Sequence, residues 1–421
     1  MKKFLSLTLA LMLLLTSCFL FGCNNETVVD DENQAEVEGE VEGETEGDVV
    51  ENALSDIKVG FIFLHDENST YDKNFLDAAL AAKEALGLTD EQVIVKVNVP
   101  EGNECYETAA ELVEAGCDVI FADSFGHEDF MIKAAKEFTD VVFCHATGTK
   151  AHTENLPNYY NAFASIYEGR YLVGVAAGLK LNAMIENGEI TAEEAKIGYV
   201  GAFPYAEVKS GYTSFFLGAR SVCPTATMDV KFTNSWFDIA LEKEAANALI
   251  ADGCVLMSQH ADSEGAPKAC EEAGVPDVAY NLDTREWGPN TALVSSKINW
   301  QPYFEHMITS VAKGEAITQD FCGGLAEGVV QTLGFNEKVA APGTAEKMEE
   351  VKNALIAGEI KVFDTKTFTV NGAELTSYMA DVDSDAAFTG DTEVVADGYF
   401  QESKFRSAPY FDIDIDGITI K

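Results

Sequence analysis

From residue 59 onward, short apolar runs alternate with longer segments that have one apolar face. The first run, Val59–Leu64, is rich in β-forming residues and is typical of a fully buried strand in a parallel sheet. A polar loop, His65–Tyr71, follows it, and Asp72 can cap a helix that extends to Gly87. The same alternation then predicts strands at Val93–Val97, Asp118–Ala122, Val141–His145 and Tyr160–Ser165, and helices at Glu104–Ala115 and Glu128–Phe138.

A second round of alternation begins at Lys196, after an Ala- and Gly-rich segment, Tyr167–Met184, that reads as a close-packed helix. The pattern predicts strands at Ile197–Gly201, Asp229–Phe232, Val255–Met257, Asp277–Asn281 and Ala292–Lys297, and helices at Val208–Ala219, Ile239–Ala251, Pro267–Gly274, Tyr303–Ala312 and Pro342–Ala357. Strands that alternate with helices indicate βαβ units and a parallel sheet. The sequence therefore predicts an α/β protein with two doubly wound lobes.

The later elements are expected to return to both lobes through crossover strands. Lobe 1 is expected to comprise residues 57–165 plus about 298–328, and lobe 2 residues 166–296 plus about 329–421. A Gly-rich extended segment, Gly323–Gly334, is among these returning elements, and a turn-rich, β-like C-terminal tail follows in lobe 2. Ligands of open α/β sheets bind beyond the carboxyl ends of the strands, so a cleft between the lobes is the expected site.

The first 23 residues have the organisation of a bacterial export signal. A basic start is followed by an apolar stretch, Phe4–Leu15, that is too short to span a bilayer. Two cysteines then resemble lipidation sites, and Cys23 is favoured over Cys18 because Gly22 precedes it and polar residues follow it. An ordinary signal peptide with incidental cysteines is the alternative. Two acyl chains on such a cysteine would hold the protein firmly at the extracytoplasmic face of the cell membrane.

Residues 24–56 contain thirteen acidic residues and no Lys or Arg. Such a segment cannot bury enough apolar surface to offset the entropy of ordering it, so a disordered tether is expected. The whole chain has 28 basic and 71 acidic residues, a net charge of −43, which argues against a nucleic-acid partner. With 421 residues and 47% hydrophobic composition, the chain is long enough for two cores.

The cysteines and histidines do not form a recognisable metal or catalytic pattern. Seven cysteines beyond the amino terminus have no CxxC spacing, and they read as buried thiols, with a stray disulfide left open: Cys105, Cys117, Cys144, Cys223, Cys254, Cys270 and Cys322. The six histidines lie far apart, and the sequence has no GxSxG, HExxH or P-loop motif. We therefore expect no metal site, no cofactor and no enzymatic activity.

Several short motifs resemble the basic-membrane-protein (BMP) family of ABC transporter substrate-binding lipoproteins, which includes the purine-nucleoside receptors. The motifs that carry the resemblance are Tyr71–Phe75, Ile166–Gly174, Ile197–Gly201, Asn234–Asp238, Gln259–Ser263 and Tyr280–Asp283. The resemblance implies the type I periplasmic-binding-protein fold, a small ligand gripped between the lobes and delivery to a permease. It also implies a purine base held between aromatic rings, with polar groups on the ribose.

Candidate site residues follow the predicted strand ends. In lobe 1 they are Tyr71, Asp72, Ser124 and Phe125, and in lobe 2 they are Phe203, Trp236, His260, Asp262, Asn281, Asp283 and Lys297. Alternatives stay open for several of them. Asp72 is a ligand group or a helix N-cap, Trp236 covers a ligand or a domain interface, and Lys297 resembles the ribose-contacting lysine of the family or serves the hinge. The resemblance places an acidic residue where this chain has Asn281, which leaves ribose recognition open.

These observations favour a lipid-anchored receptor that binds a purine nucleoside or nucleobase for an ABC importer. A binding protein or sensor for another small solute, such as a sugar or furanose, is the alternative. A surface enzyme such as a nucleoside hydrolase is the third hypothesis, and the absence of a catalytic motif disfavours it.

Overall fold

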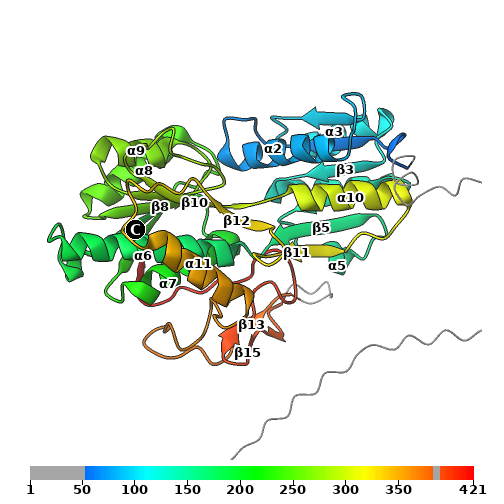
Figure 1. Ribbon diagram of the computed structural model, residues 1–421. Helices are drawn as coiled ribbons and strands as arrows, with labels where there is room; N and C mark the ends of the chain where they lie inside the picture. The colour runs from blue at the N-terminus through cyan, green and yellow to red at the C-terminus, as the bar shows by residue number, and fades with distance from the viewer. Residues whose placement is uncertain (1–52, 383–388) are drawn as a thin grey trace, which may run out of the picture. The chain divides into compact units, whose positions relative to one another are not determined.

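The computed structural model describes residues 53–382 and 389–421. The predicted signal segment, both candidate lipidation cysteines and the predicted tether up to residue 52 lie outside the described residues. The structure confirms the predicted α/β fold class, with two sheets of mainly parallel strands flanked by helices (Figure 1).

The first sheet, with its helices, is called lobe 1. Its six strands are all parallel and lie in the order β11-β5-β4-β3-β1-β2. Their bounds are β1 (Val59–Ile62), β2 (Val93–Lys96), β3 (Val119–Ala122), β4 (Val142–Ala146), β5 (Tyr159–Ala164) and β11 (Asp320–Gly323). The helices of this lobe are α2 (Thr70–Ala85), α3 (Asn103–Glu114), α4 (Glu128–Glu137), α5 (Ala151–Glu154) and α10 (Gln301–Lys313). β1 is fully buried, as its continuous apolar sequence predicts.

The second sheet, with its helices, is called lobe 2. Its strands lie in the order β12-β10-β9-β8-β6-β7-β17, and β12 runs antiparallel to β10 while the other neighbours are parallel. The strands are β6 (Lys196–Gly201), β7 (Thr227–Phe232), β8 (Leu256–His260), β9 (Asp277–Tyr280), β10 (Ala292–Ile298), β12 (Val330–Leu333) and β17 (Ile418–Ile420). The helices are α6 (Ile166–Glu186), α7 (Ala206–Val222), α8 (Ile239–Ala251), α9 (Gly265–Ala273) and α11 (Thr344–Ile356).

The Ala- and Gly-rich sequence of α6 allows this helix to pack closely against α7. A Cβ on Gly174 would lie 2.1 Å from the carbonyl oxygen of Phe215, and a Cβ on Gly218 would lie 2.0 Å from that of Tyr171. Only glycine permits so close an approach of two helix backbones. The predicted close-packed helix is therefore confirmed, and it forms the base of lobe 2 in Figure 1.

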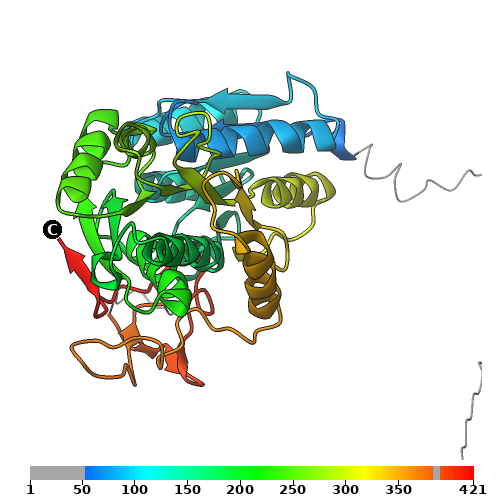
Figure 2. The same cartoon turned by 60° about the vertical axis from the view of Figure 1, so that its left-hand side comes forward.

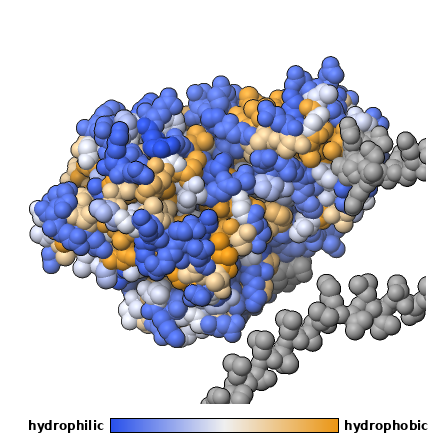
Figure 3. Space-filling view, viewed as in Figure 1, coloured by the Kyte–Doolittle hydropathy of each residue, from blue (hydrophilic) through white to orange (hydrophobic). Residues whose placement is uncertain are grey.

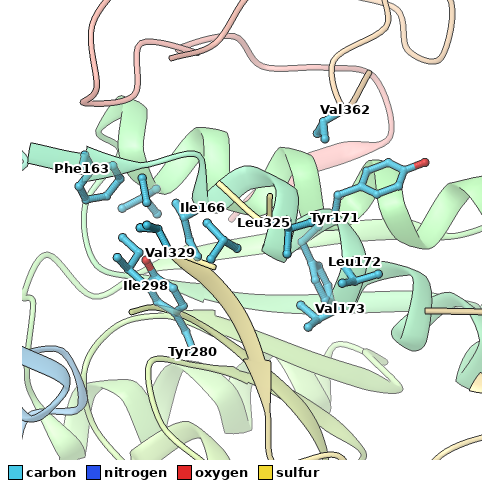
Figure 4. Packing of buried hydrophobic residues seen from close by; sticks show 14 of the residues in the cluster. Phe163, Ile166, Tyr171, Leu172, Val173, Tyr280, Ile298, Leu325, Val329 and Val362 are labelled. Carbon is cyan, nitrogen blue, oxygen red and sulfur yellow. The ribbon is translucent and has the colours of Figure 1, made fainter. Parts of the chain in front are cut away.

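The chain passes between the two sheets at three places: between β5 and α6, between β10 and α10, and between β11 and β12. The Gly-rich segment that was expected to be one extended piece is instead two short strands that belong to different sheets. Apolar side chains pack around these crossings, among them Phe163, Ile166, Ile298 and Val329 (Figure 4). A buried apolar cluster therefore surrounds the crossings between the two lobes.

The C-terminal tail contains four two-residue strands, β13 (Met379–Ala380), β14 (Thr392–Glu393), β15 (Val395–Ala396) and β16 (Tyr399–Phe400). Residues 401–416, called the strap below, form no strand, yet Tyr410 and Phe411 in them are buried. The ring of Phe411 stacks on Phe363 with centroids 4.4 Å apart. After the strap, β17 pairs with β7 at the edge of the lobe 2 sheet, as the red arrow beside the green strands shows in Figure 2.

Across the described ranges, no helix is long and apolar enough to cross a membrane. Hydrophilic residues cover much of the face in Figure 3, and apolar areas interrupt them. Exposed large apolar residues such as Leu80, Val95 and Leu241 lie on separate elements of the two lobes, as is normal for a protein surface.

Candidate binding site between the lobes

A narrow pocket, with about 20 Å³ of space accessible to water, lies between the carboxyl ends of the strands of the two lobes. Lobe 1 contributes Leu64, His65, Tyr71, Asp72, Ser124, Phe125 and Thr147, and lobe 2 contributes Glu207, Trp236, His260 and Asp262. No Lys or Arg is among these lining residues, so the described pocket suits a neutral or cationic ligand better than an anion.

Seven of the eleven predicted site residues line this pocket. They are Tyr71, Asp72, Ser124, Phe125, Trp236, His260 and Asp262. Each of these residues lies at the end of a strand or in the segment that follows one, and residues far apart in the sequence meet because the strands of both lobes have their carboxyl ends at the cleft.

Phe203, Asn281, Asp283 and Lys297 do not line the pocket. Phe203 lies behind Trp236, with the two rings in an edge-to-face contact at 5.1 Å. Asn281 is buried in a left-handed conformation with φ 69°, and its N–H donates to the carbonyl of Ser296.

The other two residues have partners elsewhere. The carboxylate of Asp283 pairs with the guanidinium of Arg285 at 2.5 Å. Lys297 lies on β10 opposite Gln331 of β12, where burial lowers the pKa of its ammonium group. Because β10 leads into a crossing between the lobes, the position of Lys297 agrees with the hinge alternative.

Tyr71 forms part of the lobe 1 wall and is fixed at both ends. Its hydroxyl donates a 2.8 Å hydrogen bond to the carbonyl oxygen of Asp123, and its ring meets Phe75 edge-on at 4.8 Å. Phe75 is fully buried and stacks on Trp300 at 4.5 Å. Phe75 is therefore a core residue that supports Tyr71 and not a ligand-stacking ring.

The prediction that Asp72 caps the helix is wrong. Ser69 is the N-cap of α2, and its hydroxyl accepts a hydrogen bond from the N–H of Asp72. This leaves the Asp72 carboxylate free to accept hydrogen bonds from the N–H of His65, at 2.7 Å, and from the hydroxyl of Ser69. Its carboxylate thus organises the loop that leaves β1.

Asp72 and Asp123 form a pair of neighbouring carboxyl groups with opposite pKa shifts. Burial acts to raise the pKa of Asp72, but hydrogen bonds from His65 and Ser69 outweigh it and lower the pKa. Burial, followed by the negative charge of Asp72, raises the pKa of Asp123 well above its usual value. Asp72 therefore carries the charge of the pair while Asp123 keeps a proton, because two adjacent carboxylates cannot both ionise cheaply.

Asp262 dominates the lobe 2 wall. Its N–H donates to the carbonyl of Trp236 at 2.9 Å, and its own carbonyl accepts from the N–H of Thr70 at 2.8 Å. The second bond joins lobe 2 to the first residue of α2 in lobe 1. Burial, followed by the charges of Glu242, Asp72 and Glu207, raises the pKa of the Asp262 carboxyl well above its usual range.

No hydrogen bond to the Asp262 carboxyl is found within the described part of the chain, and the residue is only 5% exposed. Buried carboxyl groups in proteins are normally hydrogen-bonded. A carboxyl that lines a pocket and has no protein partner is positioned to accept hydrogen bonds from a ligand.

Aromatic rings of the two lobes meet across the cleft. Phe125 of lobe 1 lies 5.6 Å from Tyr205 of lobe 2, and His65 lies 5.5 Å from Phe237. Together with the Thr70–Asp262 hydrogen bond, these contacts show that the lobes touch over the pocket.

Four lining residues were not among the predicted site residues: Leu64, His65, Thr147 and Glu207. Leu64 and His65 follow β1, and Thr147 follows β4. Because ligands of open α/β sheets bind beyond the carboxyl ends of the strands, this position in the sequence could have identified all three residues. Glu207 gives no such signal, because acidic residues are common in the first turn of a helix. In the structure Glu207 lies 3.4 Å from Nε2 of His260.

The two doubly wound lobes, the crossings between them and the enclosed pocket define the class of type I solute-binding proteins. Solved structures support this fold. A solute-binding protein of an ABC transporter from Aeropyrum pernix K1 superposes with a TM-score of 0.61 at 19% identity, covering 73% of this chain and 93% of that one. A solute-binding protein of an ABC transporter from Conexibacter woesei DSM 14684 superposes with a TM-score of 0.59 at 18% identity. This match covers 72% of this chain and 98% of that one.

More specifically, residues 62–366 match the family model Bmp, described as ABC transporter substrate-binding protein PnrA-like, and the chain belongs to this family. The predicted family is confirmed. Its members are extracytoplasmic solute-binding proteins of ABC transporters, not enzymes, and they bind a small-molecule ligand and a permease.

Two curated relatives differ in their named ligands. The chain is 34% identical over 322 residues to a purine-binding protein of Brucella abortus (strain 2308), covering 76% of this chain and 86% of the relative. It is 35% identical over 254 residues to a protein of Haloferax volcanii named as a candidate glucose-binding protein of an ABC transporter. That match covers 60% of this chain and only 59% of the relative.

Proposed function

We propose that this protein binds a purine nucleobase or purine nucleoside in the pocket between its lobes and delivers it to an ABC permease. The observation that carries the proposal is the pairing of aromatic rings, Tyr71 and Trp236, with the carboxyl groups of Asp72 and Asp262 in a pocket without a lining cation. A purine offers a flat π-face for the rings and N–H donors for the carboxyl oxygens. The purine-binding relative from Brucella abortus supports the same ligand class.

The proposal includes the predicted anchoring and domain organisation. Residues 1–23 would be the signal segment that ends in the lipidated Cys23, with Cys18 as the alternative, and residues 24–56 the tether. Lobe 1 would comprise 57–165 with about 298–328, and lobe 2 would comprise 166–296 with about 329–421. Radiolabelled fatty acid should label the wild-type chain, and Cys23→Ser should abolish the label while Cys18→Ser should not.

Ligand screening tests the proposed ligand class directly. The protein should first be unfolded and refolded to remove any co-purified ligand. A thermal-shift panel and titration calorimetry should then compare purine bases, purine nucleosides, pyrimidine nucleosides and sugars. Stabilisation by purines alone supports the proposal, because bound ligand stabilises the folded state by mass action. No stabilisation by any purine would refute it.

A sugar is the second candidate, because the Haloferax volcanii relative is named as glucose-binding. Aromatic rings and carboxylates also suit a sugar, whose hydroxyl groups donate hydrogen bonds to carboxylates. Glucose and other hexoses in the same panel decide between the two: stabilisation by a hexose without stabilisation by a purine would favour the sugar receptor.

A further inference from the structure

The hydroxyl groups that line the candidate pocket direct their protons into the protein. The hydroxyl of Ser124 donates a 2.5 Å hydrogen bond to the carboxylate of Glu101. The hydroxyl of Thr147 donates at 2.5 Å to the carbonyl oxygen of Ala146, and that of Tyr71 also donates to a backbone carbonyl. A hydroxyl group has one proton, so each of these oxygens offers only lone pairs to a ligand.

His260 orients the carboxylate of Glu207 in the pocket wall. Nε2 of His260 lies 3.4 Å from Oε1 of Glu207. On the other side of the ring, Nδ1 packs against the backbone of α7, where a Cβ on Gly211 would lie 2.6 Å from it. Among the described residues Nδ1 has no hydrogen-bond partner.

This arrangement decides which nitrogen of His260 carries the proton. Burial lowers the pKa of His260, so the neutral ring has a single N–H. A proton on the buried Nδ1 would have no acceptor, which is costly, so the proton belongs on Nε2, where it faces Glu207. In the part of the chain that the structure describes, the second carboxylate oxygen of Glu207, Oε2, accepts no hydrogen bond and is left for a ligand.

Acceptors therefore outnumber donors among the side chains of this pocket. Besides the hydroxyl oxygens and Glu207, the wall has the charged carboxylate of Asp72 and the carboxyl group of Asp262. The imidazole of His65 lies with Nδ1 3.4 Å from the Asp72 carboxylate, so its N–H is used there. The donors that the described lining side chains leave to a ligand are the indole N–H of Trp236 and the proton of Asp262.

A pocket with this excess of acceptors discriminates between substituents on a purine ring. An exocyclic amino group brings two N–H donors to the wall, whereas an oxo group at the same position brings only lone pairs. Two acceptors that face each other leave both unpaired, and an unpaired buried polar group costs more than a hydrogen bond contributes.

We infer that the pocket selects purines with an amino group, of the adenine type, over purines with an oxo group at the same position, and that Glu207, positioned by His260, sets this preference. The inference rests on the proposed function and narrows its ligand class. Neither the positions of the strand ends nor the family resemblance singled out Glu207.

Titration calorimetry on the refolded full chain tests the preference with three bases of similar shape. The six-membered ring of 2,6-diaminopurine bears two amino groups, that of adenine one, and that of hypoxanthine a carbonyl oxygen and a single N–H. We expect adenine to bind at least about tenfold more tightly than hypoxanthine, and 2,6-diaminopurine at least as tightly as adenine.

Glu207→Gln exchanges an acceptor for a donor at nearly unchanged shape. The amide oxygen can keep the N–H of His260, so the amide nitrogen takes the place of the free oxygen and faces the ligand. We expect the ratio of adenine to hypoxanthine affinity to fall at least about tenfold, with weaker adenine binding and tighter hypoxanthine binding. Thermal unfolding without ligand verifies that the variant is folded.

Glu264→Gln is the matched control, because it removes the same charge from the same lobe. The carboxylate of Glu264 pairs with Lys268 at 2.8 Å and does not line the pocket, so the affinity ratio should stay unchanged. The inference is overturned if the wild type binds hypoxanthine as tightly as adenine, if Glu207→Gln leaves the ratio unchanged, or if Glu264→Gln lowers it equally. If the wild type binds no purine at all, the proposed function itself fails and this inference with it.

Discussion

The substitution Asp262→Asn tests whether the carboxyl group of Asp262 binds the ligand or only supports the fold. In the native protein this carboxyl is buried in the pocket wall, and burial and three neighbouring carboxylates raise its pKa. A group whose pKa is higher in the folded than in the unfolded state contributes stability at low pH, and this contribution is lost as the pH rises through the folded pKa. Asn cannot ionise, so Asp262→Asn should be more stable than the wild type at neutral and higher pH.

The same substitution should weaken ligand binding. Above the folded pKa of Asp262, where the carboxyl is ionised, a hydrogen bond to this charged group contributes about 1.5–3 kcal/mol, and Asn replaces one carboxylate oxygen by an amide donor. Losing one such bond corresponds to an affinity about 10- to 150-fold lower. Because the ionised carboxylate is the better acceptor, wild-type affinity should increase as the pH rises through the folded pKa of Asp262, and the variant should lose this dependence.

Titration calorimetry across pH, combined with thermal unfolding of the ligand-free protein, measures both effects. Asp277→Asn is the control, because Asp277 on β9 is also buried, and burial raises its pKa to about 7, but it does not line the pocket. The control should gain stability above pH 7 without losing affinity. If Asp262→Asn kept wild-type affinity and its pH dependence, the assignment of Asp262 as a ligand acceptor would be refuted.

Three further substitutions test the site and the fold. Trp236→Ala should weaken purine binding about 5- to 150-fold in calorimetry, because base–aromatic stacking contributes about 1–3 kcal/mol, and unchanged affinity would contradict it. Arg170→Met should lower the free energy of unfolding in urea by about 3–5 kcal/mol, because the fully buried guanidinium donates to Tyr199 and Ser258, whereas a loss below about 1 kcal/mol would argue against this. Burial raises the pKa of Glu402 to about 8, so its contribution to stability is lost as the pH rises from about 4.5 to 8. Glu402→Gln should flatten the melting temperature over that range, and an unaltered profile would count against the assignment.

The fold was predictable because its strands are short, buried and continuous in apolar sequence. Val59–Leu64 predicted β1 (Val59–Ile62), and the Ala- and Gly-rich run predicted α6 as a closely packed helix. The segment Gly323–Gly334 was harder, because two four-residue strands in different sheets leave no periodicity that a single sequence reveals. What places β11 and β12 in different sheets is their pairing with β5 and β10, which are distant in the chain.

The site was predictable where a side chain follows a strand end, as Asp262 follows β8. It was not predictable where partners decide the role of a residue. Asp283 follows β9 but is paired with Arg285, and of the two roles left open for Asp72, that of N-cap is filled by Ser69. Sequence spacing gives the edge of the sheet on which a residue lies, but only the three-dimensional neighbours decide whether its polar atoms are free for a ligand.

The strap extends this reasoning from single residues to a whole segment. Its buried core, around Tyr410 and Phe411, belongs to no helix or strand. The sequence of the strap therefore has no helical or strand periodicity from which its burial could be predicted. It is held by contacts to β11 and α7, elements of different lobes. Because one segment touches both lobes beside the pocket, any change in the angle between the lobes must alter its contacts. The strap that makes these contacts with both lobes lies outside the family-matched part of the chain.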